Sequence, residues 1–255
     1  MPVFTTTDGI SLSYRVWPGA SGLPLVLLHH GFIADGESNW VSPGVVAALT
    51  AAGRRVAAVD ARGHGRSDKP HDPASYGEAR MAQDVRTLID LLQEPTYDLV
   101  GYSMGAIVSL LTAVADTRVR RLVVGGVGAA VVELGGVDTR VIGEPALRQA
   151  LRADDPADVT DPAAAGFRAF VDAVEGDRIA LAAQAAAAHD RPIPLETIKA
   201  PTLVLAGRDD PLAVRPHVLA EAIPDATLRL VPGDHMRAVG APAFRDELVG
   251  FLGGV

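Results

Sequence analysis

The residues best suited to chemistry in this 255-residue chain surround Ser103, at the centre of Gly101-Tyr102-Ser103-Met104-Gly105. The segment before it, residues 97–100, is predicted to be a short buried strand, and an apolar helix is predicted to begin near Ala106. A strand that becomes a helix with almost no loop holds its serine in a strained backbone conformation with the hydroxyl in the open. A hydroxyl is a poor nucleophile until a positioned base takes its proton and an acid orients that base. Chemistry at Ser103 therefore requires a base and an acid elsewhere in the chain.

The Gly-x-Ser-x-Gly segment resembles the nucleophile elbow of the α/β-hydrolase superfamily. The resemblance implies a serine, an acid and a histidine in that order, and the chain has this order. Residues 207–211 are similar to the acid loop of the family, in which the acid stands three residues after a glycine. That position is Asp210, and Asp209 is the alternative. Residues 232–236 resemble the Gly-x-His loop of the family, which makes His235 the base.

Two backbone N–H groups are expected to stabilise the negative oxygen that develops during acyl transfer. One is the N–H of Met104, directly after the serine. His30-Gly31-Phe32 is similar to the His-Gly-x segment of the family, and the resemblance implies that the N–H of Phe32 is the second. His30 itself is expected to hydrogen-bond the loop that carries Phe32. His189, at the end of the helix predicted at 177–189, is a candidate to reach the pocket.

The segment 60–67 carries a further resemblance. It matches the Asp-x-Arg-Gly-x-Gly-x-Ser pattern of the superfamily. We assign no catalytic role to it. Asp60 and Arg62 are expected to brace the loops beneath the site.

Strands and helices are predicted to alternate regularly on both sides of residues 128–191. The predicted strands are 3–7, 11–17, 25–29, 56–59, 97–100, 121–126, 202–206 and 227–231, and the predicted helices include 43–52, 78–92, 215–222 and 242–252. The first two strands are expected to form a hairpin through a two-residue turn at Asp8-Gly9. Regular alternation implies a parallel sheet with right-handed crossovers. We therefore predict an α/β-hydrolase fold, with a mostly parallel eight-stranded sheet and helices on both faces.

Residues 128–191 interrupt this alternation, because they contain no convincing strand. Helices are expected at 144–151, 163–174 and 177–189. We interpret this segment as a small helical cap inserted into a core domain made of residues 1–127 and 192–255. Four apolar residues at helical spacing are expected to pack the cap against the core, with one or two lining the pocket: Phe167, Phe170, Val171 and Val174.

The composition excludes several classes of protein. A net charge of −8 argues against nucleic acid and anionic membranes as partners, because both require clustered Lys and Arg. The chain has no cysteine, so it has no disulfide and no thiolate metal site. Residues 1–5 do not resemble the start of a signal peptide, and no apolar stretch approaches the ~20 residues that span a bilayer. We expect a cytoplasmic protein, and nothing in the sequence indicates its oligomeric state.

An acidic run at residues 154–161 contains four aspartates, a pattern that can hold a metal ion. No histidine is spaced nearby as a further ligand. Such runs are typical of solvated loops in which aspartates cap helices, and we expect that here. No metal and no cofactor are expected.

The resemblance implies a serine hydrolase that cleaves a small, largely apolar carboxylic ester or lactone through an acyl-enzyme intermediate. Because the elbow residue is a serine, family members that need a carboxylate there, such as epoxide hydrolases and haloalkane dehalogenases, are excluded. Enol-lactone hydrolases and cofactor-free perhydrolases or haloperoxidases share the Ser-Met-Gly elbow and remain alternatives. A ligand-binding relative without activity is a further alternative, although such relatives often lose a triad member.

Overall fold

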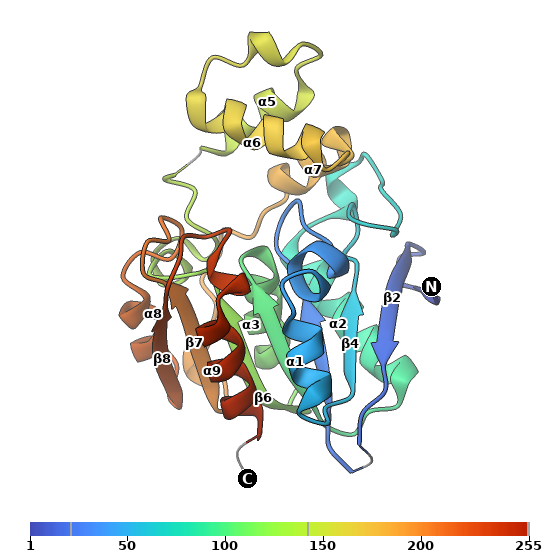
Figure 1. Cartoon of the computed structure of the whole chain (residues 1–255). Helices are drawn as coiled ribbons and strands as arrows, with labels where there is room; N and C mark the ends of the chain where they lie inside the picture. The colour runs from blue at the N-terminus through green and yellow to red at the C-terminus, as the bar shows by residue number, and fades with distance from the viewer. Residues whose placement is uncertain (21, 142, 254–255) are drawn as a thin grey trace.

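An eight-stranded sheet forms the centre of the molecule in the computed structural model, which describes residues 1–20, 22–141 and 143–253 (Figure 1). The strand order is β1-β2-β4-β3-β5-β6-β7-β8. β2 pairs antiparallel with β1 and β4, and the remaining pairs are parallel. The predicted fold class is thus confirmed. The strands are β1 (Val3–Thr5), β2 (Ser11–Trp17), β3 (Leu25–His29), β4 (Val56–Val59), β5 (Tyr97–Tyr102), β6 (Val119–Gly125), β7 (Thr202–Gly207) and β8 (Ala226–Val231).

The turn between β1 and β2 differs from the two-residue turn predicted at Asp8-Gly9. The N–H of Thr6 donates to the carbonyl of Ile10 at 2.9 Å, and the N–H of Gly9 donates to the carbonyl of Thr6 at 3.0 Å. Three residues therefore form the loop. Gly9 has a φ of +87°, which glycine adopts without strain and which closes three-residue hairpins of this kind.

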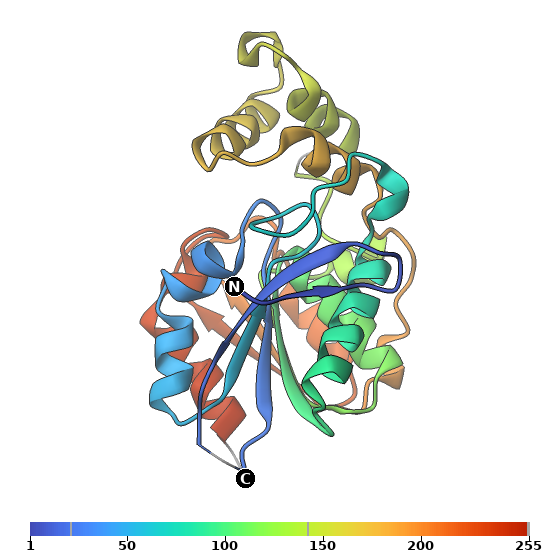
Figure 2. The same ribbon diagram turned by 90° about the vertical axis from the view of Figure 1, so that its right-hand side faces the viewer.

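Helices cover both faces of the sheet (Figure 2). The side chains of β3 alternate between the two faces: Leu25 and Leu27 join a core that includes α2 and α3, whereas Val26 and Leu28 join a core that includes α1 and α9. Burial on both faces explains why the central strands are uninterrupted apolar runs. The helices are α1 (Val45–Ala51), α2 (Glu78–Leu92), α3 (Met104–Ala115), α4 (Ala130–Leu134), α5 (Glu144–Arg152), α6 (Pro162–Ala173), α7 (Arg178–Ala186), α8 (Pro216–Ala222) and α9 (Pro242–Gly253), with short helical turns at Glu37–Val41, Pro73–Ser75, Pro156–Asp158, Leu195–Thr197 and Ala238–Gly240.

Helices α5, α6 and α7 lie together above the carboxyl ends of the parallel strands (Figure 1). The described residues between β6 and β7 contain no strand. Helix α4 contacts α8 beside the sheet and does not join this group. Asp155 and Asp161 accept hydrogen bonds from the backbone N–H groups of Ala157 and Ala164, both at 2.8 Å. The acidic run thus caps helices as predicted.

A small apolar cluster links the helices above the sheet to the core. Ile33, which follows the loop after β3, packs with Val171 and Leu181, and Phe167 packs against this group. The prediction for Val171 and Phe167 is therefore confirmed, whereas Val174 is 45% exposed and does not pack there. No helix in the described part of the chain is both long enough and apolar enough to cross a membrane.

Candidate active site

Ser103, His235 and Asp210 form one hydrogen-bonded line, although long stretches of chain separate them. They follow β5, β8 and β7, whose carboxyl ends meet at one edge of the sheet. The Nε2 atom of His235 lies 3.1 Å from the Oγ of Ser103. Its Nδ1 atom lies 2.9 and 3.1 Å from the two carboxylate oxygens of Asp210. Asp209, the alternative acid, is exposed, and the acid that contacts the histidine is Asp210.

The contacts of Asp210 determine which nitrogen of His235 carries the proton. An ionised carboxylate only accepts hydrogen bonds, so Nδ1 donates and Nε2 is left as the acceptor that faces the serine. The Asp210 side chain is fully buried, and its Oδ1 also accepts the N–H of Leu212 at 2.8 Å. This arrangement can remove a proton from the hydroxyl of Ser103.

Ser103 occupies the strained turn that the sequence predicts. Its φ is +54° and its ψ is −118°, a conformation that non-glycine residues rarely adopt. Its N–H donates to the carbonyl of Gly125 at 2.8 Å, which holds the turn against β6. A Cβ on Gly105 would lie 2.1 Å from the carbonyl oxygen of His29, so only glycine allows α3 to approach β3 this closely.

The loop that carries Phe32 lies against the serine. A Cβ on Gly31 would lie 3.2 Å from the Cβ of Ser103. The N–H of Gly31 donates to the Oδ1 of Asn39 at 2.8 Å. His30 accepts the N–H of Ala61 at its Nε2, so its Nδ1 carries the proton and donates to the carbonyl of Gly31 at 2.7 Å. Histidine and asparagine thus fix the loop beside Ser103, as expected for His30.

The N–H groups of Phe32 and Met104 both have no hydrogen-bond acceptor within the described residues. Met104 is the first residue of α3, and the first N–H groups of a helix lack intrahelical partners. Both groups are therefore free to donate to a developing oxyanion. Their joint role as an oxyanion hole remains a prediction.

Asp60 and Arg62 hold neighbouring loops together. Asp60 accepts the N–H groups of Gly36 and Arg66 at 2.9 and 3.0 Å. Arg62 is fully buried and makes paired contacts with Asp84, the shorter at 2.7 Å. These bonds fix the loop after β4 beneath the segment that carries Phe32.

Apart from His235, no histidine in the described part of the chain has a side-chain hydrogen bond to Ser103 or Asp210. Burial lowers the pKa of both His29 and His64 to about 3, so both rings are neutral at pH 7. His71 is exposed and contacts Asp177 before α7 at 3.1 Å. His189 does not line the pocket, although its neighbour Ala188 does.

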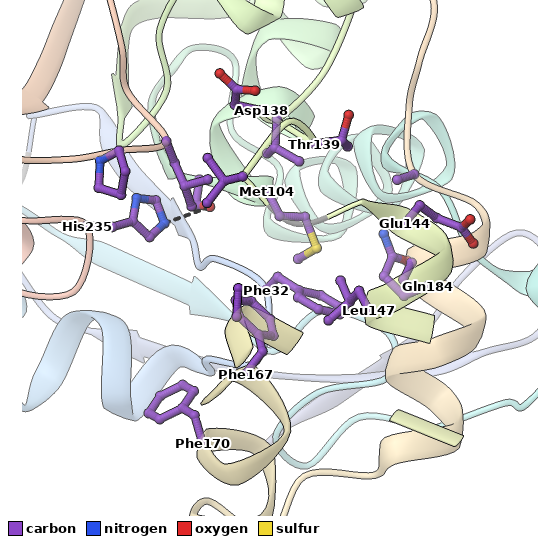
Figure 3. A pocket seen from close by; sticks show the side chains of 18 of the residues that line it. Phe32, Met104, Asp138, Thr139, Glu144, Leu147, Phe167, Phe170, Gln184 and His235 are labelled. Carbon is purple, nitrogen blue, oxygen red and sulfur yellow. Dashed lines mark hydrogen bonds between the residues drawn. The ribbon is translucent and has the colours of Figure 1, made fainter. Parts of the chain in front are cut away.

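A cavity of about 510 Å³ opens beside Ser103 and His235, between the strand ends and α5, α6 and α7 (Figure 3). This volume lies within the range of ordinary small-molecule sites. Two of the predicted cap residues, Phe167 and Phe170, contribute to its wall. The other lining residues are Phe32, Glu78, Met104, Val137, Asp138, Thr139, Val141, Glu144, Leu147, Ala163, Gly166, Gln184, Ala185, Ala188, Pro211, Leu212 and Met236.

Two residues of the site were missed by sequence reasoning. The hydroxyl of Tyr102 donates to the backbone carbonyl of His235 at 2.6 Å, and the two rings lie 5.3 Å apart. Tyr102 therefore holds the backbone of His235 and packs against its ring. In the sequence, this role was indicated only by the position of Tyr102 directly before Ser103. Glu78, at the start of α2, also lines the pocket. Nothing in the sequence indicated this position, because an acid in the first turn of a helix is common.

Glu78 is a buried acid without a basic partner among the described residues. Its Oε2 accepts the N–H of His189 at 2.7 Å, and its Oε1 lies 3.5 Å from the Nε2 of Gln184. Burial raises the pKa of Glu78 to about 7. Burial dominates because the charged form loses its hydration without gaining a counter-ion.

Glu78→Gln is expected to raise the free energy of unfolding, relative to that of wild type, more at about pH 8 than at about pH 5. The folded-state pKa of Glu78 lies above its unfolded value of 4.5, so the stability that its protonated form contributes is lost as pH rises through about 7. Glutamine does not titrate. The difference in unfolding free energy between variant and wild type should grow by roughly 1–3 kcal/mol across this window. Urea unfolding at both pH values measures it, and an equal difference at both would contradict the assignment.

Comparisons with known proteins extend over nearly the whole chain. A family model described as alpha/beta hydrolase fold matches residues 24–168. The "Putative carbamate hydrolase RutD" of Variovorax paradoxus (strain S110) is 33% identical over 270 residues, covering 90% of this chain and 96% of that protein. The crystal structure of a hydrolase from Pseudomonas aeruginosa PA01 is 30% identical, with a TM-score of 0.80 and coverage of 99% and 98%. The enol-lactonase from Burkholderia xenovorans LB400 is 26% identical, with a TM-score of 0.75 and coverage of 99% and 100%.

Proposed function

Because the chain belongs to the alpha/beta hydrolase fold family, we propose that this hydrolase cleaves small, largely apolar carboxylic esters or lactones, with Ser103 as the nucleophile. One observation carries the proposal. The line Ser103–His235–Asp210 is complete, and it opens into a largely apolar cavity of about 510 Å³. A ligand-binding relative without activity would not require a strained serine within hydrogen-bond reach of an oriented histidine.

The proposed reaction has two steps. The Oγ of Ser103 attacks the carbonyl carbon of the ester while the Nε2 of His235 takes its proton. His235 then gives that proton to the departing alcohol, which leaves an acyl group on Ser103. Water, deprotonated by the same nitrogen, attacks the acyl-enzyme. His235 then returns that proton to the Oγ of Ser103 as the carbon–oxygen bond breaks, which releases the acid and the free serine. Asp210 holds His235 in the required tautomer and stabilises its charged form throughout.

The N–H groups of Phe32 and Met104 are proposed to stabilise the tetrahedral intermediate. Both lie on segments packed against Ser103, and both lack acceptors within the described residues. Backbone donors of this kind favour the transition state because they are oriented before the charge develops. No metal or cofactor takes part in the scheme.

Residues 128–191 are proposed to act as a cap that selects the substrate, inserted between two parts of a core domain, 1–127 and 192–255. Helices α5, α6 and α7 contribute much of the pocket wall, including Leu147, Phe167 and Gln184. The triad, in contrast, comes entirely from the core. The residues that perform the chemistry are thus separate from those that contact most of the substrate.

A fluorophosphonate probe tests the proposal directly. We expect one adduct, on Ser103, in the native protein and none after heat unfolding. A panel of p-nitrophenyl esters and lactones of graded size then measures kcat/KM, beside a peroxide-dependent halogenation assay for the perhydrolase alternative. Absence of an adduct together with absence of ester and lactone hydrolysis would overturn the proposal. Halogenation without hydrolysis would favour the alternative.

A further inference from the structure

The pocket has acidic groups in its wall, and the part of the chain that the structure describes contributes no lysine or arginine to it. The acids are Glu78, Asp138 and Glu144. Asp138 contacts Arg140 at 2.6 Å, and Glu144 contacts Arg148 at 3.4 Å, so an arginine outside the pocket compensates each of these two charges. Glu78 has no such partner among the described residues, and its side chain is the most deeply buried of the three.

Only one oxygen of Glu78, Oε2, accepts a short hydrogen bond from a described residue; the contact of Oε1 with the Nε2 of Gln184 is at the long limit of 3.5 Å. The N–H of His189 needs only a neutral acceptor, which the amide oxygen of a glutamine would supply. A carboxylate at this position adds a desolvation penalty without an ion pair to offset it. Each carboxylate oxygen can also accept more than one hydrogen bond, and the contact with Gln184 is long, at 3.5 Å. Glu78 can therefore accept a further hydrogen bond from a bound donor.

Glu78 belongs to the part of the pocket away from the histidine. Gln184, the side chain beside Glu78, lies on the opposite side of Met104 from His235 (Figure 3). The apolar side chains of Phe32, Met104 and Leu147 lie between the two ends. A bound molecule that reaches both ends would therefore have its reacting carbonyl at one end, an apolar body, and a second polar group at the other.

We propose that Glu78, assisted by Gln184, binds a primary ammonium group at the far end of the acyl chain of the substrate. The ammonium supplies the positive charge and the N–H donors that Glu78 lacks. The amide oxygen of Gln184 accepts the N–H of Gly77 at 3.5 Å, and its second lone pair can accept another proton of the ammonium. Esters that carry a carboxylate at the same position are rejected, because the described residues that line the pocket include no lysine or arginine. This selectivity between esters rests on the proposed ester hydrolysis. The binding experiment described below does not depend on hydrolysis.

The kinetic experiment compares p-nitrophenyl 6-aminohexanoate with the isosteric heptanoate and with the monoester of heptanedioic acid, in series of graded chain length, at about pH 8. Wild type is expected to prefer the amino ester to its alkyl isostere at the optimal length, and to hydrolyse the anionic ester most slowly. Glu78→Gln, which keeps the acceptor for His189, should reduce the ratio of kcat/KM for amino and alkyl esters by about tenfold or more. An unchanged ratio would overturn the proposal.

Two further variants separate charge from packing. Glu144→Gln removes a pocket carboxylate that an arginine already compensates, and it should change the ratio less than about threefold. Glu78→Asp keeps the charge but withdraws it by one methylene, so the preferred amino ester should become one carbon longer. If Glu144→Gln lowered the ratio as much as Glu78→Gln, the general acidity of the pocket would explain the selectivity and the specific role of Glu78 would be rejected.

Binding to the Ser103→Ala variant provides a readout that does not depend on hydrolysis. We expect 6-aminohexanamide to bind at least about tenfold more tightly than heptanamide by calorimetry, and Glu78→Gln in the same background to abolish the difference. Equal affinities would overturn the ammonium site even if esters are hydrolysed. Preferential binding of the amine without any hydrolysis by wild type would support the site and reject only the proposed function.

Discussion

Ser103→Ala is expected to lower kcat for p-nitrophenyl esters by about 10⁴- to 10⁶-fold. Alanine lacks the oxygen that attacks the carbonyl, so no acyl-enzyme can form and His235 has no hydroxyl to deprotonate. The residual rate should come from substrate binding and from the backbone donors at Phe32 and Met104. Alanine also tolerates the positive φ at this position no better than serine, so the fold and its stability should change little.

The measurement is initial-rate kinetics with enzyme purified in a host that lacks competing esterases, beside urea unfolding. Ser109→Ala is the matched control. Ser109 is a buried serine on α3 whose hydroxyl has no hydrogen-bond partner among the described residues. Its removal should leave kcat within about twofold of wild type. Retention of most activity in Ser103→Ala would reject the nucleophile, whatever the control does.

Asp210→Asn is expected to lower kcat by about 10³- to 10⁴-fold. The asparagine amide can present an N–H group to the Nδ1 of His235, which favours the tautomer whose Nε2 carries the proton. That nitrogen then faces Ser103 as a donor and cannot act as a base. The variant also loses the charge that stabilises the protonated histidine during acyl transfer.

Asp209→Asn is the control for this prediction, because it makes the same chemical change one residue earlier. Asp209 is exposed, and its N–H, which donates to the carbonyl of Gly233 at 3.2 Å, is unchanged by the substitution. Its kcat should stay within about threefold of wild type. If Asp209→Asn lost activity and Asp210→Asn kept it, the acid would be reassigned to the other aspartate.

The central elements of the fold were predictable because their sequence patterns follow from burial. The strands 25–29 and 56–59 and the helix 78–92 have the predicted bounds. Both strands are covered on two faces and are therefore continuous apolar runs. The helix is covered on one face and shows apolar residues at helical spacing. In each case the local pattern and the tertiary environment select the same structure.

Element ends were less predictable where a side chain has a distant partner. Strand β6 was predicted to begin at Arg121 but begins at Val119, because two arginines interrupt its apolar pattern. Arg120 enters the strand by pairing with the buried carboxylate of Asp98 at 2.7 and 2.8 Å. The pattern around Arg120 contains no sign of Asp98, which lies on the neighbouring strand.

The sequence by itself determined the order of the candidate residues, with Ser103 in its elbow and His235 in a loop after the last strand. It left two aspartates open as the proposed acid. Only the tertiary structure determines that the carboxylate buried against the histidine is that of Asp210, because this depends on how the loops after β7 and β8 pack. Glu78 had no sequence signal. Its burial and its contacts with Gln184 and His189 arise from segments more than a hundred residues away along the chain, which only the tertiary structure brings against α2, and no described residue supplies a counter-ion.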